Sequence, residues 1–268
     1  PDPAAGEQVY WAAGCASCHA ADGDETRLVL AGGYRLKSDF GTFISPNISP
    51  GPDHGIGNWT LEQFANSVLK GTTPGGSHYF PAYPYSSYAG MKDQDVVDLW
   101  AFLQTLPPSD VPSQPHEVGF PFNVRLAVGG WKFMYFDSDR DTSDMDRGTY
   151  LVEVLGHCAE CHTPRDALGG LDRSRWMAGA PNPSGPGRIP NITPAVLDWS
   201  DLDPEGPGFA YESQDWRRLV FSFGDTGELV HPRAERQDAI RRPIPDAKAE
   251  PLRLEAPQEA NEGDDGED

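Results

Sequence analysis

The feature that most constrains this chain is a five-residue pattern, C-x-x-C-H, which occurs twice. The first copy runs from Cys15 to His19 and the second from Cys158 to His162. In c-type haem attachment, the two thiols add to the haem vinyl groups and the adjacent histidine supplies the proximal imidazole. We therefore expect two covalently bound haem c groups, with His19 and His162 as iron ligands. The attached thiols would be the chain's four cysteines, Cys15, Cys18, Cys158 and Cys161.

Other uses of paired cysteines explain the pattern less well. A four-cysteine zinc ribbon has its pairs about 15–20 residues apart, whereas these pairs stand near residues 15 and 158. A thioredoxin-type site needs a βαβ setting, which the sequence does not indicate. Disulfides would give no reason for a histidine after each pair. Covalent haem is the interpretation that accounts for all five positions.

Further segments recur with the two motifs. Pro46–Pro50 reads PNISP and Pro190–Pro194 reads PNITP, and Trp59 recurs as Trp199. The simplest explanation is two copies of one module. We expect a first domain over residues 1–108, a linker over 109–146, a second domain over 147–254 and an acidic disordered tail over 255–268.

The first module carries clear helix signals. Residues 4–14 have a helical pattern that leads into the haem motif. Thr60 and Gln63 form a capping box, which predicts a helix that continues through Lys70 and ends at Gly71. Apolar residues at helical spacing predict a further helix from Asp93 to Leu106, stopped by a pair of prolines.

The first and last of these helices can cross closely. Gly6 has no side chain to keep a neighbouring helix away, and Tyr10 lies one turn further along to fill the crossing. We expect the two residues to meet Leu99 and Phe102 on the last helix.

The charge balance restricts the partners. The chain has 41 acidic and 21 basic residues, a formal net charge of −20, and residues 255–268 contain acidic but no basic side chains. This charge argues against nucleic acid and anionic membranes, and it favours a redox partner protein with a basic docking face. The tail has the composition of a disordered segment.

The chain also gives indications of its location. Haem is attached to C-x-x-C-H outside the cytoplasmic membrane, so we expect a periplasmic protein. The opening Pro1-Asp2-Pro3 reads as the start left after signal-peptide removal. The most apolar stretch, 118–136, is interrupted by Arg125 and Lys132 and is a poor transmembrane candidate. Membrane association through a complex, and an anchor removed earlier, both stay open.

The middle of the linker is strongly aromatic. It runs from Gly119 through Trp131 to Phe136. We favour an inter-domain core here, with a surface that docks a partner protein as the alternative.

Longer segments around the motifs resemble a known family. They are 147–165, which contains the second motif followed by Thr-Pro-Arg, and also 46–60 and 76–85. All three are similar to the cytochrome c subunits of bacterial membrane-linked alcohol, gluconate and sugar dehydrogenases, over about residues 5 to 200. Those subunits usually carry three haems, whereas this chain has two motifs. The resemblance implies an all-α, loop-rich fold of two tandem cytochrome c-like domains, each around one covalent haem.

The resemblance also implies further site residues. The sixth ligand of the first haem lies in a loop just before the last helix, and Met91 matches it. Trp59 and Trp199 would pack at the haem edges. His54 and His78 are rival ligands that we expect to line the pocket or to form hydrogen bonds.

The second module departs from the family pattern after Trp199. Carrying the repeat forward places Ile244 where Met91 stands, and isoleucine cannot bind iron. His231 is our first candidate for the sixth ligand of the second haem, although it aligns with His78. Met177 and an open coordination site are the alternatives, and Met177 aligns with Leu30, a wall position.

The function expected from this pattern is electron transfer by the iron of two haems. We expect a carrier between a dehydrogenase or other donor and a respiratory acceptor, rather than an enzyme. An integral cytochrome subunit of a dehydrogenase or oxidase complex is one alternative. A haem enzyme that acts at an open second haem is the other.

Overall fold

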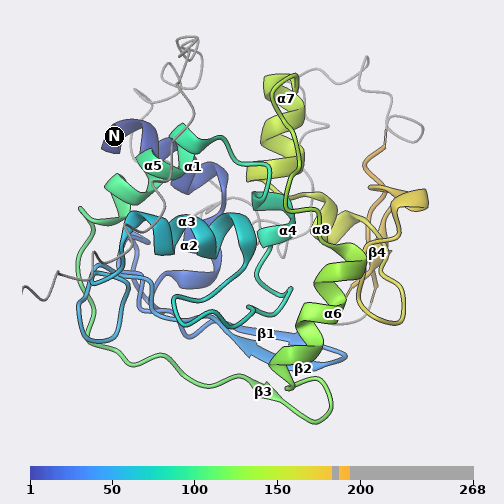
Figure 1. Cartoon of the computed structure of the whole chain (residues 1–268), viewed down its shortest axis with the longest axis horizontal. Helices are drawn as coiled ribbons and strands as arrows, with labels where there is room; N and C mark the ends of the chain where they lie inside the picture. The colour runs from blue at the N-terminus through green and yellow to red at the C-terminus, as the bar shows by residue number, and fades with distance from the viewer. Residues whose placement is uncertain (183–186, 194–268) are drawn as a thin grey trace, which may run out of the picture.

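A computed structural model of the protein describes residues 1–182 and 187–193. Figure 1 shows the small sheet of β1, β2 and β3 along the lower edge of the molecule, with most of the helices above it. The N-terminal part contributes α1 (Pro3–Ala12), α2 (Cys15–His19), α3 (Leu61–Lys70), α4 (Tyr85–Tyr88) and α5 (Asp93–Leu103). The later part contributes α6 (Arg125–Tyr135), α7 (Arg147–Tyr150), the π-helical turn η1 (Leu151–Leu155), α8 (Ala159–His162) and the 3₁₀ turn η2 (Arg173–Arg175).

Short strands accompany the helices, and the all-α expectation did not include them. Strands β1 (Arg35–Ser38), β2 (Gly41–Ile44) and β3 (Glu117–Val118) form an antiparallel sheet, and β4 (Ala180–Pro181) pairs with β5 (Arg188–Ile189). Gly41 allows β3 to approach, because a Cβ there would lie 2.5 Å from the Glu117 carbonyl oxygen. The sheet therefore joins the linker to the first predicted domain.

The crossing of α1 and α5 has the close packing that Gly6 predicts. A Cβ at Gly6 would lie only 1.9 Å from the Asp98 carbonyl oxygen. The ring of Tyr10 is fully buried, with its centroid 5.3 Å from that of Phe102. Leu99 is buried in the same cluster. The absence of a side chain at Gly6 thus allows α1 and α5 to lie this close together.

Helix α3 begins and ends where its sequence predicts. Thr60 accepts a hydrogen bond from the Gln63 backbone, and the Gln63 side chain accepts one from the Thr60 backbone. Gly71 ends the helix in the left-handed conformation, with φ 56°. Helix α5 begins at Asp93 as predicted but ends at Leu103 rather than Leu106.

Helix α6 buries a lysine beside a valine, Lys132 and Val128, and leaves several other apolar residues exposed. The Lys132 ammonium is buried, and it donates to the carbonyl oxygens of Lys70 and Gly71 at 2.6 and 2.7 Å, at the C-terminus of α3. This contact satisfies carbonyls that the end of a helix leaves unpaired. Burial lowers the pKa of Lys132 to about 8. On the other face, Leu126 and Phe133 are 84% and 93% exposed.

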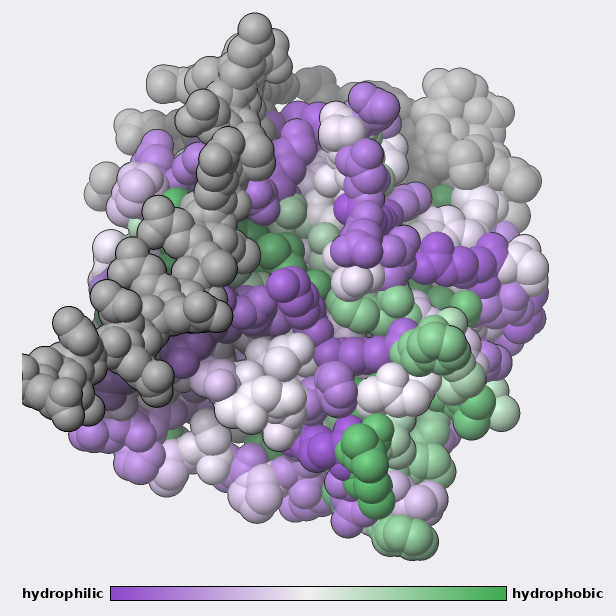
Figure 2. Space-filling model, in the orientation of Figure 1, coloured by the Kyte–Doolittle hydropathy of each residue, from purple (hydrophilic) through white to green (hydrophobic). Residues whose placement is uncertain are grey.

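The aromatic linker is therefore only partly an inter-domain core. One face of α6 packs on α3, while its other face adds to the apolar surface visible at the lower right of Figure 2. The core expectation assumed that apolar residues would supply the buried face. Val128 does so in part, but it shares the buried face with Lys132, which caps a neighbouring helix.

One hydrophobic cluster joins the two parts of the chain. It contains Tyr88, Met91 and Leu99 from the first predicted domain, and Tyr150 and Val154 from the second. In residues 1–182 and 187–193, no helix combines the length and the apolar character that a membrane span requires.

Candidate functional site

The first motif lies on a short helix that starts at a left-handed glycine. Gly14 has φ 65°, and α2 follows directly with Cys15, Cys18 and His19. The His19 Nδ1 atom lies 2.8 Å from the Pro46 carbonyl oxygen. Because that oxygen can only accept a hydrogen bond, Nδ1 carries the proton. The unprotonated Nε2 is therefore the nitrogen with which His19 would bind iron.

The second motif repeats this arrangement. His157, with φ 40°, stands where Gly14 stands, and α8 then carries the motif histidine. The His162 Nδ1 atom lies 2.9 Å from the Pro190 carbonyl oxygen. Each motif histidine thus donates to the proline that opens its own P-N-I segment. The internal repeat seen in the sequence is therefore also a structural repeat.

Backbone hydrogen bonds extend the match and place Met177. The Ile48 amide donates to the Leu30 carbonyl at 3.0 Å, and the Ile192 amide donates to the Met177 carbonyl at 3.0 Å. Met177 thus occupies the position of Leu30, as the alignment predicted. It lines a small separate pocket with Trp176 and not the space that the motifs share. This position disfavours Met177 as an iron ligand.

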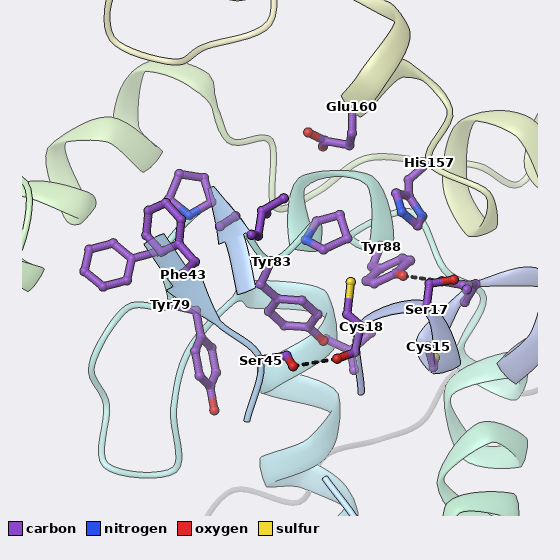
Figure 3. Close-up of a pocket in the computed structure, with 18 of the residues that line it drawn as sticks. Cys15, Ser17, Cys18, Phe43, Ser45, Tyr79, Tyr83, Tyr88, His157 and Glu160 are labelled. Atoms are coloured by element: carbon purple, nitrogen blue, oxygen red, sulfur yellow. Dashed lines mark hydrogen bonds between the residues drawn. The ribbon is translucent and has the colours of Figure 1, made fainter. Parts of the chain in front are cut away.

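Both motifs open onto one continuous cavity of about 3790 Å³. Pockets for single small ligands have volumes of about 300–1,000 Å³, so this space can hold more than one large group. Figure 3 shows Glu160 and His157 at its upper side, over Tyr88 and Cys18. The two attachment loops thus lie beside one another.

None of the four cysteines forms a disulfide, and the two motifs lie close enough to influence each other electrostatically. Burial raises the pKa of Cys18 to about 11, and the charge of Cys161 adds to that shift. Burial raises the pKa of Cys15 to about 12. Burial raises the pKa of Tyr34, and the charges of Cys18 and Cys161, one from each motif, add to the shift.

The motif histidines have the protonation state that metal binding requires. Burial lowers the pKa of His19 and of His162, and in each case the proline carbonyl acts weakly in the opposite direction. The neutral form therefore dominates at neutral pH. Together with the free thiols and the large cavity, these neutral imidazoles fit covalently attached haem.

Met91 and Trp59 line this cavity, as expected for residues that contact the first haem. Met91 is buried and lies between α4 and α5, with its amide donating to the Tyr88 carbonyl at 2.8 Å. His54 also lines the cavity. His78 does not, since its ring lies against α6, where a Cβ at Gly129 would be 3.1 Å from its Nε2 atom.

Two predicted residues of the second site, Trp199 and His231, lie outside the described residues, and their roles stay predictions. Sequence reasoning missed Glu160, the residue before the second cysteine of its motif. Its side chain is only 9% exposed, and it pairs with Arg165. The position of this carboxylate, between the two cysteines of the motif, was the sequence feature that could have drawn attention to it.

Comparisons with known proteins identify the family and the relatives of this chain. The cytochrome c family model matches residues 3–107. A dihaem c-type cytochrome of Cereibacter sphaeroides is 57% identical over 205 residues, which cover 74% of this chain and 69% of that protein.

Two dehydrogenase subunits are more distant relatives. The fructose dehydrogenase cytochrome subunit of Gluconobacter japonicus is 37% identical over 246 residues, covering 87% of this chain and 46% of that subunit. The cytochrome c subunit of the quinone-dependent alcohol dehydrogenase of Gluconobacter oxydans is 35% identical over 215 residues, covering 74% and 44%. The chain thus spans less than half the length of these two subunits. It belongs to the cytochrome c family, as a relative of dihaem c-type cytochromes and of the cytochrome subunits of bacterial dehydrogenases.

Proposed function

We propose that this chain is a periplasmic dihaem electron carrier that takes electrons from a dehydrogenase and passes them to a respiratory acceptor. The observation that carries the proposal is the pair of attachment motifs, each with its histidine held by a proline carbonyl, that open onto one cavity. Haem c, when bound, supplies an iron that cycles between its ferrous and ferric forms. Two such centres side by side provide an entry and an exit for the electron.

The residues of the first site have distinct roles in this proposal. His19 binds iron through Nε2, while the Pro46 carbonyl fixes the ring and increases its basicity. Met91 supplies a thioether, which favours the ferrous state and raises the potential. The buried surroundings of Met91 keep water from that side.

At the second site, His162 takes the proximal role and Cys158 and Cys161 hold the haem. We retain His231 as the proposed sixth ligand. A nitrogen ligand would give the second haem the lower potential, because imidazole stabilises ferric iron relative to a thioether.

A permanent subunit of a dehydrogenase complex is the second candidate function. The observation that favours it is a pair of exposed apolar side chains in and just before α6, Phe120 and Leu126, neither of which lines the shared cavity. Obligate interfaces are more apolar than those of transient carriers. The fructose and alcohol dehydrogenase relatives are named as subunits of such enzymes.

Salt dependence distinguishes a transient carrier from a permanent subunit. We expect the rate of electron transfer to an acceptor with a basic face to fall at least about tenfold between about 0.01 M and 1 M salt. The net charge of −20 attracts such an acceptor, and the screening length falls from about 30 Å to about 3 Å over that range. Stopped-flow spectroscopy of the reduced protein measures this rate.

A variant that ends at residue 254 serves as the comparison, because it lacks the acidic stretch 255–268. Its rate should depend less steeply on salt than that of the full chain. If the rate does not change with ionic strength in either protein, docking by charge is rejected and the role as a permanent subunit is favoured.

A further inference from the structure

The loop that carries Met91 is hydrogen-bonded by side chains from the end of the linker and from the second predicted domain. The loop comprises residues 86–92, which are the last residues of α4 and its connection to α5, and three side chains between positions 142 and 160 form hydrogen bonds with it. None of these three side chains belongs to the repeat that carries the first haem motif. They approach the loop at its middle, at its end and at its beginning.

Thr142 holds the middle of the loop, directly before Met91. Its hydroxyl donates to the Gly90 carbonyl at 2.8 Å, and both residues are buried. The contact leaves no room for a side chain on the loop, because a Cβ at Gly90 would lie 2.8 Å from Thr142 Cγ2 and 3.2 Å from Val154 Cγ2. Any movement of Gly90 would therefore break a buried hydrogen bond and disturb this packing.

Tyr150 holds the end of the loop. Its hydroxyl accepts a hydrogen bond from the Lys92 amide at 3.1 Å and donates to Asp95 Oδ2 at 2.5 Å. The tyrosine ring is buried, and burial together with the charge of Asp95 raises the pKa of its hydroxyl well above the usual value. The hydroxyl thus stays protonated and can make both bonds at once.

Glu160 holds the beginning of the loop from within the second haem motif. Its Oε1 atom accepts hydrogen bonds from Ser86 and Ser87 at 2.8 and 3.2 Å, and its Oε2 atom pairs with Arg165. A nearly buried carboxylate makes strong bonds to such donors. Motif two is in this way tied directly to α4, one turn before Met91.

We propose that the second half of the chain fixes Met91 over the first haem, with Thr142, Tyr150 and Glu160 as positioning residues for the sixth ligand. The inference rests on the proposed function, because it requires haem at the first motif with Met91 as its ligand. Weakening any of the three contacts lets the loop move away from iron more easily. An external ligand then competes with Met91 more successfully, although no residue that touches the haem has changed.

Imidazole binding to the oxidised holoprotein tests this proposal. The loss of the far-red thioether-to-iron band reports displacement of Met91. Imidazole binding at the second haem does not affect this band, because no thioether is proposed as a ligand there. Thr142→Val keeps the shape of the side chain but leaves the Gly90 carbonyl unpaired. In this variant we expect the apparent affinity of imidazole at the first haem to rise about tenfold, a change of about 1.4 kcal/mol. Tyr150→Phe should act in the same direction.

Glu160 variants separate positioning from charge. Glu160→Gln keeps an oxygen that can accept from Ser86 and Ser87, so its imidazole affinity should stay within about threefold of the wild type. Glu160→Ala removes the acceptor and should show the tenfold effect. Thr105→Val is the control, since it removes a threonine hydroxyl bond, to the Phe102 carbonyl, from a more exposed position that does not contact the Met91 loop. We expect it to bind imidazole like the wild type.

The outcomes are distinguishable. If the wild-type protein has no far-red band, Met91 is not a ligand, and both the inference and the ligation in the proposed function fail. If the band is present but Thr142→Val, Tyr150→Phe and Glu160→Ala all bind imidazole like the wild type, the proposed function stands and the inference is overturned. An equal effect in Thr105→Val would also overturn it, because the effect would then be one of general stability.

Discussion

Replacing Met91 with alanine should abolish the far-red band of the oxidised protein and lower the midpoint potential of the first haem. A thioether ligand stabilises ferrous iron, and axial ligands set haem potentials over a range of about 0.8 V. Loss of the thioether should therefore shift the potential by on the order of 0.1 V. Met91 is buried, lines the shared cavity and precedes α5, which is the arrangement that the expectation requires. Absorption spectroscopy and a redox titration measure the two effects.

Met134→Ala provides the control for this substitution. Met134 also lines the shared cavity, but it lies on α6 and its side chain is 57% exposed, whereas that of Met91 is buried. We expect the far-red band to be unchanged in this variant. A band that survives in Met91→Ala, or that disappears in Met134→Ala, would contradict the assignment of the sixth ligand.

Gly6→Ala should destabilise the folded protein by about 3 kcal/mol. The new methyl group would lie 1.9 Å from the Asp98 carbonyl oxygen, so α1 and α5 would have to move apart. Overpacking of this kind typically costs about 1–3 kcal/mol, and here the obstructing atom belongs to the backbone of a helix and cannot rotate away. Denaturant unfolding of the holoprotein measures the change.

Gly130→Ala is the matched control, because Gly130 also lies inside a helix, α6. A Cβ there would have no atom within 4 Å. Alanine favours the helix over glycine, so this variant should be stabilised by about 0.5–1 kcal/mol. Opposite signs for the two substitutions are the expected result. Equal effects would show that the close crossing does not determine the stability of the fold.

Sequence patterns predicted the parts of this molecule that depend on short stretches of chain. The capping box of Thr60 and Gln63 contains both of its own hydrogen-bond partners, so the start of α3 could be read directly. The C-x-x-C-H motifs likewise contain the two thiols and the histidine within five residues. Gly6 could be interpreted because a glycine inside a predicted helix indicates a close approach by a neighbouring element.

Contacts between distant residues could not be predicted in this way. The strand β3 pairs with β2, which lies far from it in sequence, and two residues are too short to leave a pattern. The inward Lys132 gave the opposite signal, because a lysine in an aromatic stretch indicates a surface position. Its place becomes clear only when the C-terminus of α3 is known to lie beside α6.

The same limit applies to the candidate site. Repeat alignment placed Met177 at the position of Leu30, and the backbone bonds agree. It could not show that the two motifs share a cavity, or that Glu160 reaches Ser86 on another helix. Those relations depend on how the two halves pack together, and no local pattern records that packing.

The central claim is that both motifs of this chain hold haem, and the intact mass of the denatured holoprotein tests it most directly. Covalent attachment survives denaturation, so the mass should exceed that of the chain by two haem groups. A variant with Cys158→Ser and Cys161→Ser should retain only one. A wild-type mass with one haem or none, or a double variant that still carries two, would contradict the account.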